Sequence, residues 1–355
     1  MVTHNTNKRV RELYLKPDEP LLFPEDAIII LQSLPPWHLP KELKFTLKTR
    51  LIFWNLHPHN LLWDFKLDNL SRPLSNKLKT VYSIYLIKQF ISELLKYNAL
   101  IIMDGENKQA TEAIINKYIY DSILVPVPTE YLNRQSFSFS NNFAWLGRLA
   151  DFKISILIET IKKLAEYALK KKFKINFMII GDGPDKNIIV KSVELYKNKY
   201  FKVNFVGEID ITNLETFLIN NVSVLFAMGT SALDGARLGI PVVLLDFSYK
   251  PLKGDYIFRF LYETKNFTLA RDIGDWAYES GNTSLENIIY NLLNDYDKIS
   301  NKCFEYVKQN HEIDVVAKKF INLINNCKMD YRKMKKYRNG LRPYLRNWLS
   351  NTLNF

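Results

Sequence analysis

Glycine is scarce in this 355-residue chain: there are 12 glycines, and none occurs before Gly105. The first hundred residues therefore contain no glycine-rich phosphate loop of the kind that follows the first strand of many nucleotide-binding domains. In the second half, glycine follows nearly every expected strand, at Gly147, Gly181, Gly183, Gly207 and Gly229. The second half is thus where a binding site built from loops is expected.

Cysteine and long apolar runs are also missing. The two cysteines, Cys303 and Cys327, lie far apart and fit no metal-binding spacing, which favours incidental thiols in a reducing compartment. No run approaches the roughly 20 apolar residues that span a bilayer, and residues 1–11 lack the apolar core of a signal peptide. We expect a cytoplasmic protein, with peripheral attachment to the inner face of the membrane left open.

Acidic residues are outnumbered by basic ones, giving a net charge of +12. This favours an anionic partner: a nucleotide, an acidic membrane surface or nucleic acid. Because the basic residues are spread over many segments and form no known nucleic-acid module, a nucleic-acid-binding protein is the less favoured alternative.

Strands alternate with helices along most of the chain, which predicts an α/β fold with mainly parallel sheets in two Rossmann-like domains. The expected strands are 27–31, 51–56, 99–103, 122–127, 143–146, 175–180, 203–206, 222–228 and 242–246. The expected helices are 77–97, 108–118, 153–172, 185–200, 212–220, 232–238 and further helices within 285–327. The predicted organisation is an extended opening segment (1–26), a short N-terminal domain (27–140), a C-terminal domain (141–327) and a basic amphipathic tail (328–355), with a linker at 128–142.

Two cations lie where the first strand of the C-terminal domain enters its first helix. Arg148 follows Gly147 in the sequence GRLADFK, and Lys153 ends that sequence. Both side chains are suited to phosphate oxygens, the guanidinium as a planar fork and the ammonium as a point charge. An ordinary surface pair at a helix start is the alternative interpretation.

Two further loops have both structural and functional interpretations. In Gly181-Asp182-Gly183-Pro184, Asp182 or Gly183 is expected to cap a helix with Pro184 in its first turn. Gly207 is a tight-turn glycine. At the corner Gly229-Thr230-Ser231, Ser231 and Asp234 have the spacing of a capping box. Alternatively, Thr230 and Ser231 hold a diphosphate while Asp234 accepts ribose hydroxyls.

The order GRLADFK, IIGDGP, FVGE, MGTSALDGARLGIPVV resembles the donor-binding domain of the GT-B-fold glycosyltransferases, particularly family 4. The resemblance covers residues 142–247 well and extends loosely to 327. It implies that Arg148 and Lys153 clamp the donor diphosphate and that Asp234 holds the ribose. It also implies that Gly181–Pro184 line the site and that the turn Val206–Glu208 lies near the base.

The chain departs from this family in two ways. Family 4 enzymes usually carry a carboxylate eight positions before the residue matching Asp234, and Phe226 stands there. The retaining or inverting outcome is therefore open. The glycine-free first domain also lacks the usual loop after its first strand, so acceptor chemistry is harder to place.

The acceptor side is assigned to the end of the second expected strand. His57 is a candidate general base, with Asp104 as a second catalytic candidate, and each has a structural alternative as a hydrogen-bonded strand-end residue. Trp54, His59 and Trp63 are candidates for binding the acceptor sugar. A metal site at His57 and His59 is not expected, because no further ligand lies at a suitable spacing.

The sequence therefore predicts a glycosyltransferase without a cofactor. It would move a sugar from a nucleotide-diphosphate-sugar to a saccharide or lipid-linked acceptor, in surface polysaccharide or lipopolysaccharide synthesis. A GT-B protein that binds nucleotide-sugar without transferring it is the main alternative. The tail holds eight Lys or Arg against one Asp, which suits an anionic membrane surface. A solvated basic face and a final helix packed back on the first domain are the alternatives, and the packed helix is the favoured interpretation for the segment before Asn339.

Overall fold

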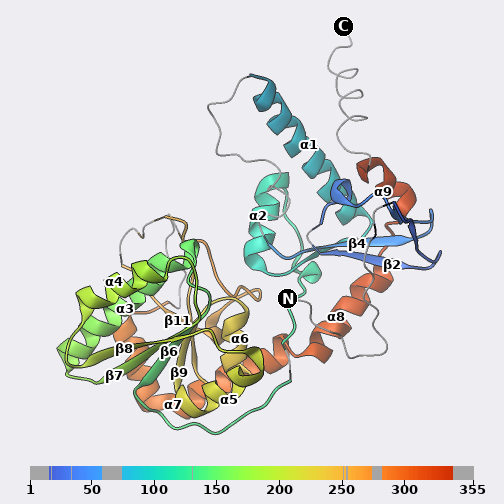
Figure 1. Cartoon of the computed structure of the whole chain (residues 1–355). Coiled ribbons are helices and arrows are strands. Elements are labelled where there is room, and N and C mark those ends of the chain that lie inside the picture. The colour runs from blue at the N-terminus through green and yellow to red at the C-terminus, as the bar shows by residue number, and fades with distance from the viewer. Residues whose placement is uncertain are drawn as a thin grey trace. The chain divides into compact units, whose positions relative to one another are not determined.

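The computed structural model describes residues 16, 18–32, 34–57, 74–129, 131–250, 252, 255–273 and 282–338; within the helix that begins at Leu74, side chains are described from residue 84. The chain divides into two compact units. The first consists of residues 1–102, 107–123 and 321–355, and the second of residues 103–106 and 124–320. Figure 1 shows the elements of both.

The first unit is built on a parallel three-stranded sheet in the order β2 (Ile28–Gln32), β4 (Arg50–Asn55), β5 (Leu100–Ile102). A separate parallel pair joins β1 (Leu21–Leu22) to β3 (Leu43–Lys44). The helices are α1 (Leu74–Lys96), α2 (Gly105–Ile115), which begins in the second unit, and the short η1 (Pro36–His38) and η2 (Asp121–Ile123). The strand expected at 122–127 is not formed, because η2 and irregular backbone occupy this stretch.

The core of the first unit centres on Phe90 of α1. Its ring packs edge-on against Phe53 of β4 at 5.6 Å and against Trp37 at 5.5 Å between centroids. Ile87, Ile91 and Leu94 of α1 are also fully buried, at the three- and four-residue spacing that places side chains on one helix face.

Part of the basic tail belongs to this first unit. Met329–Tyr331 run alongside β4, where the Leu51 amide donates to the Met329 carbonyl at 3.1 Å and the Tyr331 amide to the Thr49 carbonyl at 2.8 Å. In α9 (Tyr331–Arg338), Met334 and Tyr337 are buried while Arg332 and Lys335 are exposed. The rest of the tail, 339–355, lies outside the described residues.

The second unit contains a six-stranded sheet in the order β11-β10-β9-β6-β7-β8. Its strands are β6 (Asn142–Leu146), β7 (Ile175–Ile180), β8 (Phe201–Gly207), β9 (Val224–Ala227), β10 (Val242–Leu244) and β11 (Arg259–Phe260). All pairs are parallel except β10 with β11. The parallel strands are largely apolar, as expected where helices cover a sheet. Because β6 to β9 are parallel neighbours, the loops that follow them meet at one edge.

The helices of this unit follow the expected positions closely. They are α3 (Asp151–Lys171), α4 (Lys186–Tyr196), α5 (Ile211–Asn221), α6 (Thr230–Ala236), η3 (Leu261–Glu263), α7 (Leu285–Asn310) and α8 (Ile313–Asn326). The last of these, α8, continues from the second unit into the first.

Residues 131–141, expected to be part of a linker, are hydrogen-bonded to the second unit and pack on it. The amides of Asn133 and Gln135 donate to the carbonyls of Arg237 and Leu238, at 3.1 and 2.8 Å. Phe137 and Phe139 pack on the hydrophobic core of the sheet. The aromatic residues of this segment explain why it is not a free linker.

The strip Met103–Glu106 interrupts the first unit in the chain and groups with the second. The Gly105 amide donates to the Asn266 carbonyl at 2.8 Å, and a Cβ on Gly105 would lie 2.9 Å from both Asn266 Cβ and Thr268 Oγ1. The Glu106 carboxylate accepts from the Asp272 amide at 3.3 Å. This close fit requires glycine at position 105.

Candidate functional site

Three loops at the carboxyl edge of the six-stranded sheet are joined by backbone hydrogen bonds. They follow the adjacent strands β6, β7 and β8. The Gly147 amide donates to the Ile180 carbonyl at 3.0 Å, and the Leu149 amide to the Asp182 carbonyl at 3.0 Å. The Gly181 amide donates to the Gly207 carbonyl at 2.7 Å. The sequence motifs GRL, GDGP and GE are thus brought together, at the edge where ligands bind in open parallel sheets.

Close contact between these loops depends on glycine. Gly181 has φ +123°, and a Cβ atom there would overlap the Gly147 carbonyl oxygen. A Cβ on Gly183 would overlap the carbonyl oxygen of Leu149. The glycines therefore serve the approach of one loop to the next. The expected helix start at Pro184 is wrong: α4 begins at Lys186, and its N-cap Asp185 makes no side-chain capping hydrogen bond.

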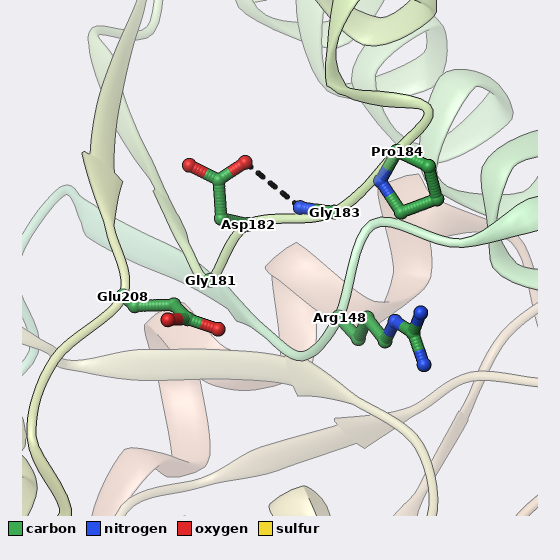
Figure 2. A pocket seen from close by; sticks show the side chains of 6 residues that line it. All are labelled: Arg148, Gly181, Asp182, Gly183, Pro184 and Glu208. Carbon is green, nitrogen blue, oxygen red and sulfur yellow. Dashed lines mark hydrogen bonds between the residues drawn. The ribbon is translucent and has the colours of Figure 1, made fainter.

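A pocket of about 690 Å³ lies over these loops (Figure 2). It is lined by Arg148, Gly181, Asp182, Gly183, Pro184 and Glu208. Asp182 is held in place, since its carboxylate accepts from the Gly183 amide at 2.8 Å and from Lys186 Nζ at 2.8 Å. These two hydrogen bonds, Lys186 first, lower the pKa of Asp182. The volume lies within the usual range for small-molecule sites.

The two expected cations lie together at this edge. Arg148 is exposed and lines the pocket, while Lys153, half-buried, places its Nζ 3.4 Å from where a Cβ on Gly147 would be. Burial, and then repulsion by Arg148, lowers the pKa of Lys153. Within the residues that the structure describes, neither cation forms an ion pair with a carboxylate. Two neighbouring positive charges without a carboxylate favour the binding of an anion.

Lys153 lies beside a cluster of three aromatic rings, of which Phe152 is the one near its ammonium group. Phe152 lies 5.7 Å from Phe247 and 5.7 Å from Tyr249, and Phe247 lies 5.8 Å from Tyr249, measured between centroids. Lys153 Nζ is 5.7 Å from the centre of the Phe152 ring. This cluster was not predicted from the sequence. Its only signals in the sequence were Phe152, directly before Lys153, and the two aromatic residues Phe247 and Tyr249 that follow β10.

The Gly229 corner does not have the helix start that the capping-box interpretation predicts. Helix α6 begins at Thr230, with Gly229 as N-cap at φ +63° and no side-chain capping hydrogen bond. Ser231 therefore lies within the helix, and the expected capping box with Asp234 is not formed. Thr230 is exposed, while Ser231 and Asp234 are half-buried. These residues, together with Gly147, Lys153 and Gly207, are not among those lining the 690 Å³ pocket.

Phe226, at the position matched to the family carboxylate, is a core residue. It lies inside β9, is fully buried and packs 6.0 Å from Phe143 and 6.1 Å from Phe177, between ring centroids. The strand occupies the position where a loop residue would be needed to reach a ligand. The missing carboxylate is therefore a difference in the local structure and not only in the side chain.

A buried network of charged side chains lies just after β10. Asp246 is fully buried and pairs with Arg259 Nη1 and Arg271 Nη2, each at 2.7 Å. Burial alone would raise the pKa of Asp246, but the two guanidinium groups lower it overall. Burial also raises the pKa of nearby Glu106, helped by Asp104, Asp272 and Asp246. Asp246 is thus a structural anchor that ties the segment after β10 to Arg259 and Arg271.

The acceptor-side candidates are only partly described. Trp54 is half-buried on β4 and His57, also half-buried, follows that strand; both belong to the first unit. Asp104 is 4% exposed and groups with the second unit. His59 and Trp63 lie outside the described residues.

Two kinds of feature are absent from the described part of the chain. No group of three or more His, Cys, Asp or Glu there is arranged to hold a metal ion. None of the helices described is both long enough and apolar enough to span a bilayer.

No family model and no curated protein matches this chain. Solved structures do match. One is a point mutant of S. aureus TarM in complex with Fondaparinux, alpha-GlcNAc-glycerol and UDP, at 18% identity and a TM-score of 0.51; the match covers 85% of this chain and 56% of that one. TarM in a second structure matches at 15% identity and a TM-score of 0.50, covering 85% of this chain and 55% of that one.

The chain thus spans a little more than half the length of the two matched chains, and at these identities the likeness concerns the fold. It agrees with the two α/β units described above, each built on a parallel sheet. The chain has the GT-B fold of the glycosyltransferases that it matches, with two Rossmann-like domains, of which the first is short.

Proposed function

We propose that the chain is a glycosyltransferase that moves a sugar from a nucleotide-diphosphate-sugar to a saccharide or lipid-linked acceptor. The observation that carries the proposal is the pocket at the sheet edge, which Arg148 lines; neither Arg148 nor the neighbouring Lys153 has a carboxylate partner among the described residues. The UDP bound in the TarM complex, a protein of the same fold, is consistent with a nucleotide ligand. A pathway of surface polysaccharide or lipopolysaccharide synthesis, and membership of family 4, are parts of the same proposal.

The two cations would act on the leaving group. When the sugar departs, negative charge grows on the nucleotide diphosphate, and cations fixed beforehand stabilise that charge without reorganising. The glycines at 181 and 183 let the loop that holds Gly147, Arg148 and Leu149 pack directly on the loop after β7, so that Arg148 lines the pocket. Gly229, Thr230, Ser231 and Asp234 are proposed to contact the diphosphate and ribose, and Gly207 to shape the turn beside Glu208.

His57 and Asp104 remain the proposed catalytic residues, with Trp54, His59 and Trp63 proposed for the acceptor. No cofactor is proposed. The exposed basic residues of α9, Arg332 and Lys335, suit a peripheral contact with an anionic membrane, where a lipid-linked acceptor would be found. A cytoplasmic location is proposed on the same grounds.

A panel of nucleoside diphosphates tests the binding half of the proposal. At 100 times its dissociation constant, a ligand specific for the folded protein adds about 2.7 kcal/mol of stability, which a melting curve detects. Replacing Arg148 and Lys153 together by Ala should abolish this shift. The control variant, Lys162→Ala with Lys174→Ala, removes the same charge from the surface near α3 and should keep it. Equal shifts in both double variants would refute the proposed clamp.

A non-catalytic nucleotide-sugar-binding protein is the second candidate. The burial of Phe226, where the family usually has a carboxylate, is the observation in its favour. Incubation with nucleotide-sugars decides between the two. Release of free nucleoside diphosphate, by transfer or slow hydrolysis, supports the enzyme, and a thermal shift without any release supports the binding protein.

A further inference from the structure

The pocket contains a carboxylate, Glu208, for which the described part of the chain provides no hydrogen-bond or ion-pair partner. Of its two acidic residues, Asp182 accepts hydrogen bonds from the Gly183 amide and from Lys186. Glu208 is exposed, and within the described chain it forms neither an ion pair nor a side-chain hydrogen bond. Its oxygens are therefore available to a ligand.

The pocket also has a positive end and a negative end. Arg148 follows β6 and Glu208 follows β8, with the glycine loop after β7 between them. Two strand intervals of about 4.8 Å place the starts of these two loops roughly 10 Å apart. Figure 2 shows the Glu208 carboxylate beneath Gly181, on the opposite side of the view from the Arg148 guanidinium. A ligand that spans the pocket has an anionic group at one end and hydrogen-bond donors at the other.

A nucleoside diphosphate has this polarity, with phosphates at one end and the base at the other. An ionised carboxylate only accepts hydrogen bonds, and its two oxygens suit two adjacent donors. Guanine offers such a pair on its Watson–Crick edge, N1–H beside the N2 amino group. Uracil offers one N–H between two carbonyl oxygens, which a carboxylate repels. Adenine and cytosine each set one amino group beside an acceptor nitrogen.

We propose that Glu208 selects guanine, so that the donor is a GDP-sugar. This inference rests on the proposed function, because it assumes that Arg148 and Lys153 hold a diphosphate. It separates the present chain from the matched TarM complex, which contains UDP.

The test is the affinity of the full-length protein for GDP, UDP, ADP and CDP by titration calorimetry. Hydrogen bonds to a charged group contribute enough binding free energy for GDP to bind at least about tenfold tighter than UDP. In Glu208→Gln, the amide presents one donor and one acceptor, so GDP should lose about tenfold while UDP binds as well as before or better. Glu166→Gln, on the exposed face of α3, is the matched control and should change neither affinity.

Each result has a distinct meaning. GDP preferred by the parent protein, and the preference lost in Glu208→Gln, supports the inference. UDP bound as tightly as GDP, or tighter, by the parent overturns guanine selection and leaves the proposed function standing. An equal loss for all four nucleotides in Glu208→Gln also overturns it, because Glu208 would then contact the ribose. Binding of none of them overturns the proposed function itself.

Discussion

Lys153, in the first turn of α3, and Arg148, just after β6, carry like charges that repel each other. Burial, followed by this repulsion, holds the pKa of Lys153 below its usual value of 10.5. Such an arrangement is unfavourable in the unliganded protein and is relieved by an anion. It is therefore better explained by binding than by stability.

The pKa of Lys153 gives the first prediction. Arg148→Ala should raise the pKa of Lys153, because the repulsion by Arg148 is one of the two effects that lower it. Bound nucleoside diphosphate should also raise this pKa in the parent protein. NMR of ¹³C-methylated lysines measures both changes, with Lys153→Arg to assign the signal. A Lys153 signal that titrates identically in parent and Arg148→Ala would show that the charges do not interact.

The sign of the linked stability change follows from the same shift. The unfolded chain binds the Lys153 proton more tightly than the folded protein, so the free energy of unfolding rises with pH between the folded and unfolded pKa values. This rise should be smaller in Arg148→Ala. Urea unfolding between pH 8 and 10 compares the two proteins.

The glycines of the site give the second prediction. Gly181 and Gly207 both have φ in the left-handed region, at +123° and +83°, but only at Gly181 would a Cβ overlap backbone, and at Gly207 it meets nothing within 4 Å. Gly207→Ala should thus lower the free energy of unfolding by about 1–2 kcal/mol, because alanine is strained in this backbone conformation. Gly181→Ala should cost roughly 1–3 kcal/mol more, from overpacking. Equal unfolding free energies for the two variants would contradict the described contact.

Asp246 gives the third prediction. Asp246→Asn leaves Arg259 and Arg271 without their buried counter-charge and should destabilise the protein by about 3–5 kcal/mol. Folding lowers the pKa of Asp246. Its ionised carboxylate therefore stabilises the protein fully above the usual pKa of 3.8, and this stabilisation is lost as the pH falls through the pKa of the folded protein. Parent stability should therefore fall more steeply below pH 4 than that of the variant. Asp255→Asn, at an exposed ion pair with Lys163, is the control and should stay within about 1 kcal/mol of the parent.

Phe226 gives the fourth prediction. If the family carboxylate were missing only as a side chain, Phe226→Glu would restore a ligand contact. The structure predicts instead that this variant fails to fold, since a charge would lie unpaired in the core. Phe226→Leu keeps an apolar residue and should fold, with a moderate loss of stability. A folded Phe226→Glu protein with improved nucleotide-sugar binding would contradict the burial of this side chain in β9.

The second domain was largely predictable, because its apolar strands are short, bounded by glycine and separated by helices of ordinary length. Strand β7 and helix α5 fall within one residue of their expected limits. The convergence of the three motifs at one edge also followed, since the carboxyl ends of parallel strands share an edge. Helix starts were less predictable: Ser231 and Asp234, three residues apart, suggested a capping box, but Gly229 reaches a positive φ and α6 begins two residues earlier than expected.

Other features depend on contacts between distant parts of the chain and have no local signal. The pairing of Asp246 with Arg259 and Arg271 joins residues 13 and 25 positions apart. The fastening of residues 131–141 could not be predicted from their Ser- and Asn-rich composition, although Phe137 and Phe139 were a hint. The pairing of Met329–Tyr331 alongside β4 likewise joins segments about 280 positions apart in the chain.

The strip Met103–Glu106 has a practical consequence for dividing the protein. A fragment of residues 124–320 would lack Gly105 and Glu106, so the Asn266 carbonyl and the Asp272 amide would lose their hydrogen bonds, and the surface around Thr268 would be uncovered. The two domains therefore cannot be produced separately by single cuts between them. An insertion, a split or a circular permutation must keep this four-residue strip with the larger half.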